Sequence, residues 1–189
     1  MIVLVVLGVI FFLILLILAF VVSNYNKLVK FRNAVQDQWA QIEVLIKRRA
    51  DLIPNLVETV KGYASHEKET FEAVISARNK AVSSVESGSK EAEMQANGEL
   101  SQVLGRLFAL SEAYPELKAD SSFLKMQDNL KETEDKIAYA RQFYNDAVLK
   151  YKNKIEMFPS NIIAGIFNFK PEPFFEATEA ERVVPDVKF

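Results

Sequence analysis

The sequence predicts an all-α protein: an N-terminal transmembrane helix followed by an antiparallel, up-and-down helical bundle that resembles a four-helix bundle, with no sheet. Three observations lead to this fold class. All charged residues, 23 basic and 25 acidic, lie at or after Lys27. The apolar residues beyond that point recur at the 3,4 spacing of a helix, and no run alternates with the period of a strand. Long helices joined by short connections favour antiparallel neighbours.

The first predicted element is a membrane anchor over residues 1–23. Ile2 to Val22 contains only apolar residues and Gly8, and as a helix it extends about 32 Å, enough to cross a hydrocarbon core of about 30 Å. A buried core helix and a cleaved signal peptide are the alternatives. A signal peptide normally has a basic first region, a shorter apolar run and a small-x-small cleavage pattern, which this sequence lacks. We therefore expect a retained anchor that contacts the lipid bilayer through Ile2 to Val22.

The charges next to the apolar run predict its direction in the membrane. Lys27, Lys30 and Arg32 follow the run directly, whereas only the α-amino group precedes it. Under the positive-inside rule, the basic side of a span stays in the cytoplasm. We therefore expect a single-pass protein with its N-terminus outside and its body in the cytoplasm.

The predicted bundle, residues 24–158, begins with a helix that contains a proline. Pro54 removes one backbone donor, and its ring crowds the carbonyl of Ala50. Either the helix kinks there, or a new helix starts with Asp51 as its N-cap. Because the apolar pattern resumes in phase, we expect a kinked but near-continuous helix to about Ser87. Its apolar stripe consists of Leu28, Phe31, Val35, Ile42, Leu45, Leu52, Leu56 and Tyr63, widened by Trp39, Ile46, Ile53 and Val60.

Two further long helices complete the predicted bundle. After a turn at 87–89, a helix over 90–113 is expected to end at Tyr114-Pro115. A polar loop over 116–122 follows, in which Ser121 or Ser122 can cap the last long helix. That helix carries a large apolar residue at every seventh position: Phe123, Leu130, Ile137, Tyr144, Tyr151 and Phe158.

The predicted C-terminal tail, residues 159–189, begins where Pro159 stops the last long helix. Ser160 or Asn161 can cap a short helix through Phe167, and Pro171 and Pro173 favour an extended segment after it. The tail and the residue before it are rich in phenylalanine, at Phe158, Phe167, Phe169, Phe174, Phe175 and Phe189. Two interpretations stay open. The tail closes the groove of the bundle, or it presents an apolar patch to a partner, a sister subunit or the bilayer surface.

Composition excludes several classes of function. A net charge of −2 gives no reason to expect nucleic-acid binding. With no cysteine and one histidine, the chain cannot form a disulfide, a thiolate zinc site or a multi-histidine metal site by itself. His66-Glu67 resembles the start of a helical zinc motif, but Thr70 stands where the second histidine belongs. We find no phosphate loop, dinucleotide fingerprint or nucleophile elbow, and expect no cofactor and no enzymatic activity.

One basic cluster, Lys47-Arg48-Arg49, stands out in the first bundle helix. We expect Arg48 and Arg49 to pair with carboxylates such as Asp51 or with another helix, and a partner's acidic surface is the alternative. We further hypothesise that Arg49, bonded to exposed helix-end carbonyls or to Asp51, lies in a cluster at the Pro54 kink near the turn at residues 114–115. The candidate interaction or structural residues are Arg48, Arg49, Asp51, Pro54, Asn55, Tyr114, Pro115, Phe158, Pro159, Phe174 and Phe175.

A set of motifs extends over nearly the whole chain: Tyr25-Asn26-Lys27-Leu28-Val29, Arg32-Asn33, Trp39, residues 47–57, Lys61-Gly62-Tyr63, His66-Glu67, residues 113–119, Phe123-Leu124, Leu130, Ala140-Arg141, Phe143-Tyr144-Asn145, residues 158–161 and Phe174-Phe175. In these motifs the sequence resembles the LemA family. The resemblance implies a bacterial inner-membrane protein with one N-terminal span, an outside N-terminus and a cytoplasmic helical bundle. It carries no enzymatic residues over. Relatives include a protein implicated in building magnetosome membranes, which favours a structural role.

Two functional hypotheses follow. The first is a membrane-anchored helical scaffold or assembly protein that forms a homo-oligomer or binds membrane-associated protein partners. The alternative is a signalling or sensing module that binds a ligand between helices and relays it through the kink at Pro54.

Overall fold

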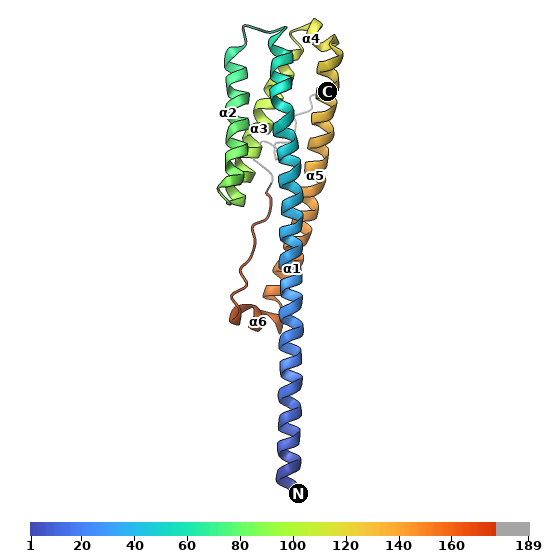
Figure 1. Cartoon of the computed structure of the whole chain (residues 1–189), viewed down its shortest axis with the longest axis vertical. Coiled ribbons are helices and arrows are strands. Elements are labelled where there is room, and N and C mark those ends of the chain that lie inside the picture. Colours follow the sequence, from blue (N-terminus) through green and yellow to red (C-terminus); the bar gives the residue numbers. More distant parts are fainter. Residues whose placement is uncertain (177–189) are drawn as a thin grey trace, which may run out of the picture. The chain divides into compact units, whose positions relative to one another are not determined.

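A computed structural model of the protein describes residues 1–176. Within that part of the chain the structure contains six helices and no strand, which confirms the all-α prediction (Figure 1). The helices are α1 (Ile2–Lys61), α2 (Lys68–Glu86), α3 (Lys90–Ser111), α4 (Pro115–Ala119), α5 (Ser121–Glu156) and α6 (Ser160–Ile166).

The described chain divides into two compact units. The first comprises residues 1–39 and 143–174, which are the N-terminal part of α1, the C-terminal part of α5, and α6 with the segment after it. The second comprises residues 40–142 together with Phe175 and Glu176 among the described residues. The predicted division into an anchor, a bundle and a tail, and the up-and-down order of that bundle, stay predictions.

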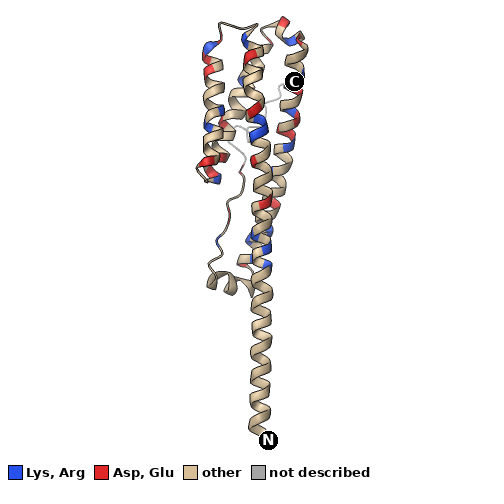
Figure 2. Ribbon diagram, viewed as in Figure 1, with Lys and Arg blue, Asp and Glu red and all other residues tan. Residues whose placement is uncertain are grey.

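The N-terminal part of α1 has the length and composition of a membrane span. Among the described residues it is the one helix that is long and apolar enough to cross a membrane. From Ile2 to Val22 every side chain except the half-buried Val21 is exposed, and Figure 2 shows no charge on this part of the helix. An apolar helix that exposes all its faces requires an apolar surrounding, which a bilayer supplies.

Pro54 does not break α1, and a second helix satisfies the carbonyl that the proline leaves without a donor. The helix continues to Lys61, and Arg78 of α2 donates its Nε hydrogen to the Ala50 carbonyl at 3.2 Å. The prediction of a near-continuous helix to Ser87 is wrong, however. The chain turns at residues 62–67 before α2 begins, since Gly62 weakens the helix at that point.

The connection between α3 and α5 also differs from the prediction. Pro115 is the first residue of the short helix α4, where a polar loop was expected, because proline suits the first turn of a helix. The cap of α5 is Asp120, not Ser121 or Ser122. The Phe123 N–H donates to Asp120 Oδ1 at 2.7 Å, as expected for an N-cap side chain.

The helices of the second unit share one apolar core. Its buried members come from α1 to α5 and include Ile53, Leu56, Val60, Phe71, Val74, Leu100, Leu107, Leu117, Phe123 and Leu130. The seven-residue repeat of α5 is buried at its first five positions, as predicted. The prediction is wrong for the last position of the repeat, because Phe158 is 80% exposed. The reason is that α5 ends at Glu156, so Phe158 no longer follows the helical period.

In the first unit, α6 ends in a capping motif that returns the chain onto α1. Asn168 adopts a left-handed conformation with φ of 55°, which asparagine tolerates better than most residues. The Phe169 N–H donates to the Ala164 carbonyl at 2.9 Å and the Asn168 N–H to the Gly165 carbonyl at 3.2 Å, the pattern of a Schellman motif. Phe169 thereby packs against a cluster of Leu28, Ile163 and Ala164.

Candidate functional site

The most unusual feature of the second unit is a buried arginine. Arg49 lies on the apolar stripe of α1, between Ile46 and Ile53, and its side chain is 1% exposed. Arginine is rarely buried to this extent unless its charge and its donors are satisfied. The groups that surround Arg49 therefore define the site.

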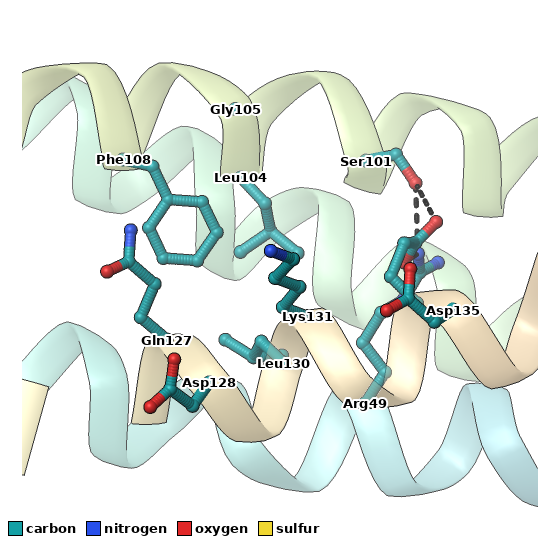
Figure 3. Close-up of a pocket in the computed structure, with 11 residues that line it drawn as sticks. Arg49, Ser101, Leu104, Gly105, Phe108, Gln127, Asp128, Leu130, Lys131 and Asp135 are labelled. Atoms are coloured by element: carbon teal, nitrogen blue, oxygen red, sulfur yellow. Dashed lines mark hydrogen bonds and ion pairs between the residues drawn. The ribbon is translucent and has the colours of Figure 1, made fainter. Parts of the chain in front are cut away.

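Three residues from two other helices receive the Arg49 hydrogen bonds. Nη1 donates to Glu134 Oε2 of α5 at 2.6 Å and to Ser101 Oγ of α3 at 2.9 Å. Nη2 donates to the side-chain oxygen of Asn97 at 2.6 Å and to its carbonyl at 3.3 Å. Asn97, itself buried, donates in turn to the Glu93 carbonyl at 2.8 Å. The guanidinium thus connects α1, α3 and α5 (Figure 3).

The electrostatics of this cluster follow from burial. Loss of water lowers the pKa of Arg49, the attraction of Glu134 opposes that effect, and Arg141 adds a smaller repulsion. Guanidinium groups stay protonated in proteins, so Arg49 is a buried cation with one direct counter-ion. Its Nε is also buried and has no hydrogen-bond partner. The hydrogen bonds of Arg49 to α3 and α5 are therefore all donated by Nη1 and Nη2.

A cleft of 550 Å³ lies beside the cluster, between α3 and α5. Leu104, Phe108 and Leu130 supply its apolar wall. Its polar side chains come from Arg49, Ser101, Gln127, Asp128, Lys131, Glu134 and Asp135. Both signs of charge occur in it, and among the described residues no group of three or more His, Asp or Glu side chains could hold a metal ion. The cleft offers an apolar wall with a mixed polar rim.

The structure separates Arg49 from the other residues of its predicted motif. Arg48 and Asp51 lie on the surface of α1, where Asp51 pairs with Lys47 at 3.2 Å. The expected bond from Arg49 to Asp51 or to helix-end carbonyls is therefore wrong, whereas its pairing with another helix is found. Pro54 and Asn55 are exposed, and the Asn55 carbonyl accepts a hydrogen bond from Thr59.

The turn at residues 114–115 meets the connection between α1 and α2. The Tyr114 hydroxyl donates to Glu67 Oε1 at 3.2 Å, and desolvation followed by this bond raises the pKa of Tyr114. Tyr63 from the same connection donates to Asp120 Oδ2 at 3.1 Å. Pro115 starts α4. The predicted cluster of this turn with Arg49 at Pro54 is therefore wrong, because the turn contacts the connection after α1 and Arg49 bonds α3 and α5.

The aromatic candidates occupy different surroundings. Phe158 is exposed and Pro159, half-buried, precedes α6. Phe174 is half-buried, with the Lys152 ammonium 5.7 Å from the centre of its ring. Phe175 is buried, and the guanidinium carbon of Arg141 lies 4.3 Å from the centre of its ring. This arrangement favours cation–π attraction. The tail therefore packs in part, and its residues 177–189, Phe189 among them, lie outside the described residues.

Sequence reasoning missed Asn97, Ser101 and Glu134. A signal for a buried polar layer was present nevertheless. The buried positions of α1 run Ile42, Ile46, Arg49, Ile53 and so on, so that Arg49 occupies a step of the 3,4 repeat and its charge points toward other helices.

The model of the LemA family matches residues 38–189. The chain belongs to the LemA family. Among its relatives, magnetosome protein MamQ 2 of Paramagnetospirillum magneticum is 29% identical over 186 residues, which cover 86% of this chain and 68% of that protein. Protein LemA of Metamycoplasma hominis is 27% identical over 165 residues, which cover 87% of this chain and 74% of that protein. Magnetosome protein MamQ of Magnetospirillum gryphiswaldense is 27% identical over 180 residues, which cover 83% of this chain and 66% of that protein.

Membership of the LemA family and the apolar N-terminal helix together make this a membrane-associated helical protein whose molecular function is undefined. Neither the family description nor the names of these relatives states an enzymatic activity. The absence of enzymatic activity stays a prediction for this LemA protein.

Proposed function

We propose that this LemA protein is a membrane-anchored helical scaffold that assembles with itself or with membrane-associated partners. The observation that carries the proposal is the Arg49 cluster. A buried cation held by three residues on two other helices favours one fixed arrangement of those helices over alternatives, which is what a platform for assembly needs. The names of the MamQ relatives, which are magnetosome proteins, agree with a role at a membrane.

Crosslinking in native membranes followed by mass spectrometry tests the assembly. A scaffold should give reproducible crosslinks between two copies of the chain or between the chain and a few membrane proteins. In parallel, light scattering of the detergent-solubilised protein should give a mass above that of one chain plus its detergent. A strict monomer at micromolar concentration, with no crosslinked partner, would contradict the proposal.

We infer that the protein lies in the bacterial inner membrane with its N-terminus outside and its body in the cytoplasm. Lys27, Lys30 and Arg32, directly after the span, support this direction. Reporter enzymes fused after Phe189 test it. A reporter that works only in the cytoplasm should be active, and activity of a periplasm-only reporter would reverse the orientation.

A second candidate function is a sensing module, and the cleft beside Arg49 favours it. A small molecule bound between α3 and α5 could shift the hydrogen bonds of Ser101 and Glu134, two residues that line the cleft and bond Arg49. Pro54→Ala separates the candidates. If the protein relays a signal through the proline, Pro54→Ala should change the cellular response to that signal. If the protein is a scaffold, Pro54→Ala should leave the crosslinks unchanged, provided that the melting temperature is also unchanged.

A further inference from the structure

An uncharged segment after α5 packs against the end of the apolar span. Met157 to Phe169 contains no charged residue. The inner face of α6, Ile163 and Ala164, forms a cluster with Leu28 of α1, and Val21 packs against that cluster. The ring of Tyr25 lies 4.8 Å from that of Phe167. The segment is therefore held at the level where the apolar span ends (Figure 1).

Side-chain contacts fix this position from α5 as well. Lys154 donates its Nζ hydrogen to Asn24 Oδ1 at 3.0 Å, two residues beyond the span. Ser160 Oγ lies 2.7 Å from the Lys154 carbonyl and 2.9 Å from that of Met157, so its hydroxyl can donate to either of these helix-end acceptors. The end of α5 and the start of α6 are thus held beside the end of the apolar span.

The outer face of the same segment is apolar and uncovered among the described residues. Phe158, Ile162 and Ile166 follow one another at steps of four, so the two isoleucines share one side of α6 and the phenylalanine precedes them. Phe158 is 80% and Ile166 71% exposed. The exposed apolar side chains of the segment are Met157, Phe158, Ile162, Ile166 and Phe167. Exposed apolar side chains concentrated on one short segment indicate a surface that is covered in the working protein.

Three observations indicate that lipid covers it. The opposite, buried face of α6 packs on α1 at the end of the span, against Leu28 and Val21, so the patch lies beside that end. The capping motif at Asn168 satisfies backbone carbonyls at the end of α6, which a low-dielectric surrounding demands. Along the sequence, basic residues outnumber acidic ones beside the end of the span and beside the segment: Lys27, Lys30 and Arg32 follow the span, and Lys150, Lys152, Lys154 and Lys170 flank the segment together with Glu156 and Glu172. Apolar side chains beside a basic rim are typical of segments that lie in the interface of anionic membranes.

We propose that α6 and the adjoining Phe158 lie in the bilayer interface as a second membrane contact beside the span. The side chains of Phe158, Ile162 and Ile166 point toward the acyl chains, about 5–10 Å below the headgroup surface. The proposal rests on the anchoring of the chain by Ile2 to Val22. It gives the first unit two contacts with one leaflet, so that α1 is held against rotation about its own axis.

Single-cysteine labelling of the full chain in vesicles tests this contact, because the chain has no cysteine of its own. Phe158→Cys and Ile166→Cys are each labelled with a polarity-sensitive fluorophore. Phe143→Cys is the matched control, since Phe143 is an exposed aromatic residue of α5 in the same unit, 60% exposed. The vesicles contain equal amounts of phosphatidylcholine and phosphatidylglycerol, with brominated acyl chains as quencher.

Labels at 158 and 166 should be quenched several-fold more strongly by the brominated lipid than the label at 143, and their emission should be shifted to shorter wavelength. Equal quenching at all three positions would overturn the proposal. So would labels at 158 and 166 that are protected from aqueous iodide and self-quench but ignore the brominated lipid, because a second copy then covers the patch. Leu13→Cys, within the span, reports on the anchor separately. If its label is not quenched, the anchoring itself has failed.

Discussion

Replacement of Arg49 by alanine should destabilise the protein strongly. The substitution removes a side chain that is 1% exposed and leaves the side-chain oxygen of the fully buried Asn97 without its donor. Glu134 is 43% exposed and regains water, so its loss of a counter-ion adds little. An unsatisfied buried acceptor costs about 1–3 kcal/mol, and truncating a large, fully buried side chain to alanine leaves a cavity that typically costs about 2–5 kcal/mol. We expect a loss of about 3–5 kcal/mol, which lowers the melting temperature by about 6–20 °C.

The assay is thermal unfolding of the full chain in detergent, followed by far-ultraviolet circular dichroism. Lys47→Ala is the matched control, because Lys47 is a cation on the same helix whose pair with Asp51 is exposed, at 77% and 56%. An exposed pair of this kind contributes about 0–1 kcal/mol. Equal melting temperatures for Arg49→Ala and Lys47→Ala would refute the reasoning.

Arg49→Lys separates charge from geometry. A lysine ammonium keeps the charge but lacks the planar fork that reaches Glu134 and Asn97 together. Its melting temperature should therefore fall between those of the wild type and Arg49→Ala. Because the guanidinium stays protonated when folded and when unfolded, the effect of Arg49→Ala should not change between neutral and mildly alkaline pH.

Three further predictions concern the backbone and its caps. Arg78→Ala leaves the Ala50 carbonyl without its donor and should lower the free energy of unfolding by about 1 kcal/mol. The loss should be smaller in a Pro54→Ala background, because alanine restores the backbone donor. A double-mutant cycle on melting temperatures measures this coupling. Asn168→Val should cost about 1–2 kcal/mol because φ there is positive, whereas Asn168→Gly should melt like the wild type. The pKa of Asp120 is lowered, first by the Phe123 amide, so the stability from its charge is complete above its ordinary pKa of 3.8 and is lost as the pH falls through the lower folded value. Asp120→Asn should flatten the fall in melting temperature on acidification to about pH 3.

The fold class and most helix positions could be predicted because they depend on local pattern. The apolar run of α1 and the seven-residue repeat of α5 are each contained in one stretch of sequence. Prediction was wrong where the chain leaves a helix without losing its pattern. Tyr63 continues the stripe of α1 although the helix ends at Lys61, and Phe158 continues the repeat of α5 although the helix ends at Glu156. Periodicity does not report the hydrogen bonds that end a helix.

The partners of Arg49 could not be predicted because they are set by packing between helices. Asn97 is 48 and Glu134 85 positions away along the chain, and no local rule selects them among the many polar residues of α3 and α5. Sequence proximity favoured Asp51 as the partner of Arg49. Residues two apart on a helix point in different directions, so Asp51 faces solvent while Arg49 faces the core.

The proline of α1 shows how a local defect and a long-range contact depend on each other. Ala50 precedes the end of α1 at Lys61 by about 16 Å of helix, and Arg78 follows the start of α2 at Lys68 by about 15 Å. The turn at 62–67 therefore places Arg78 level with the carbonyl that Pro54 leaves without a donor. One helix continuing to Ser87 would separate the two residues by about 42 Å. The turn that sequence periodicity failed to predict is thus the feature that brings Arg78 within hydrogen-bond distance of the Ala50 carbonyl.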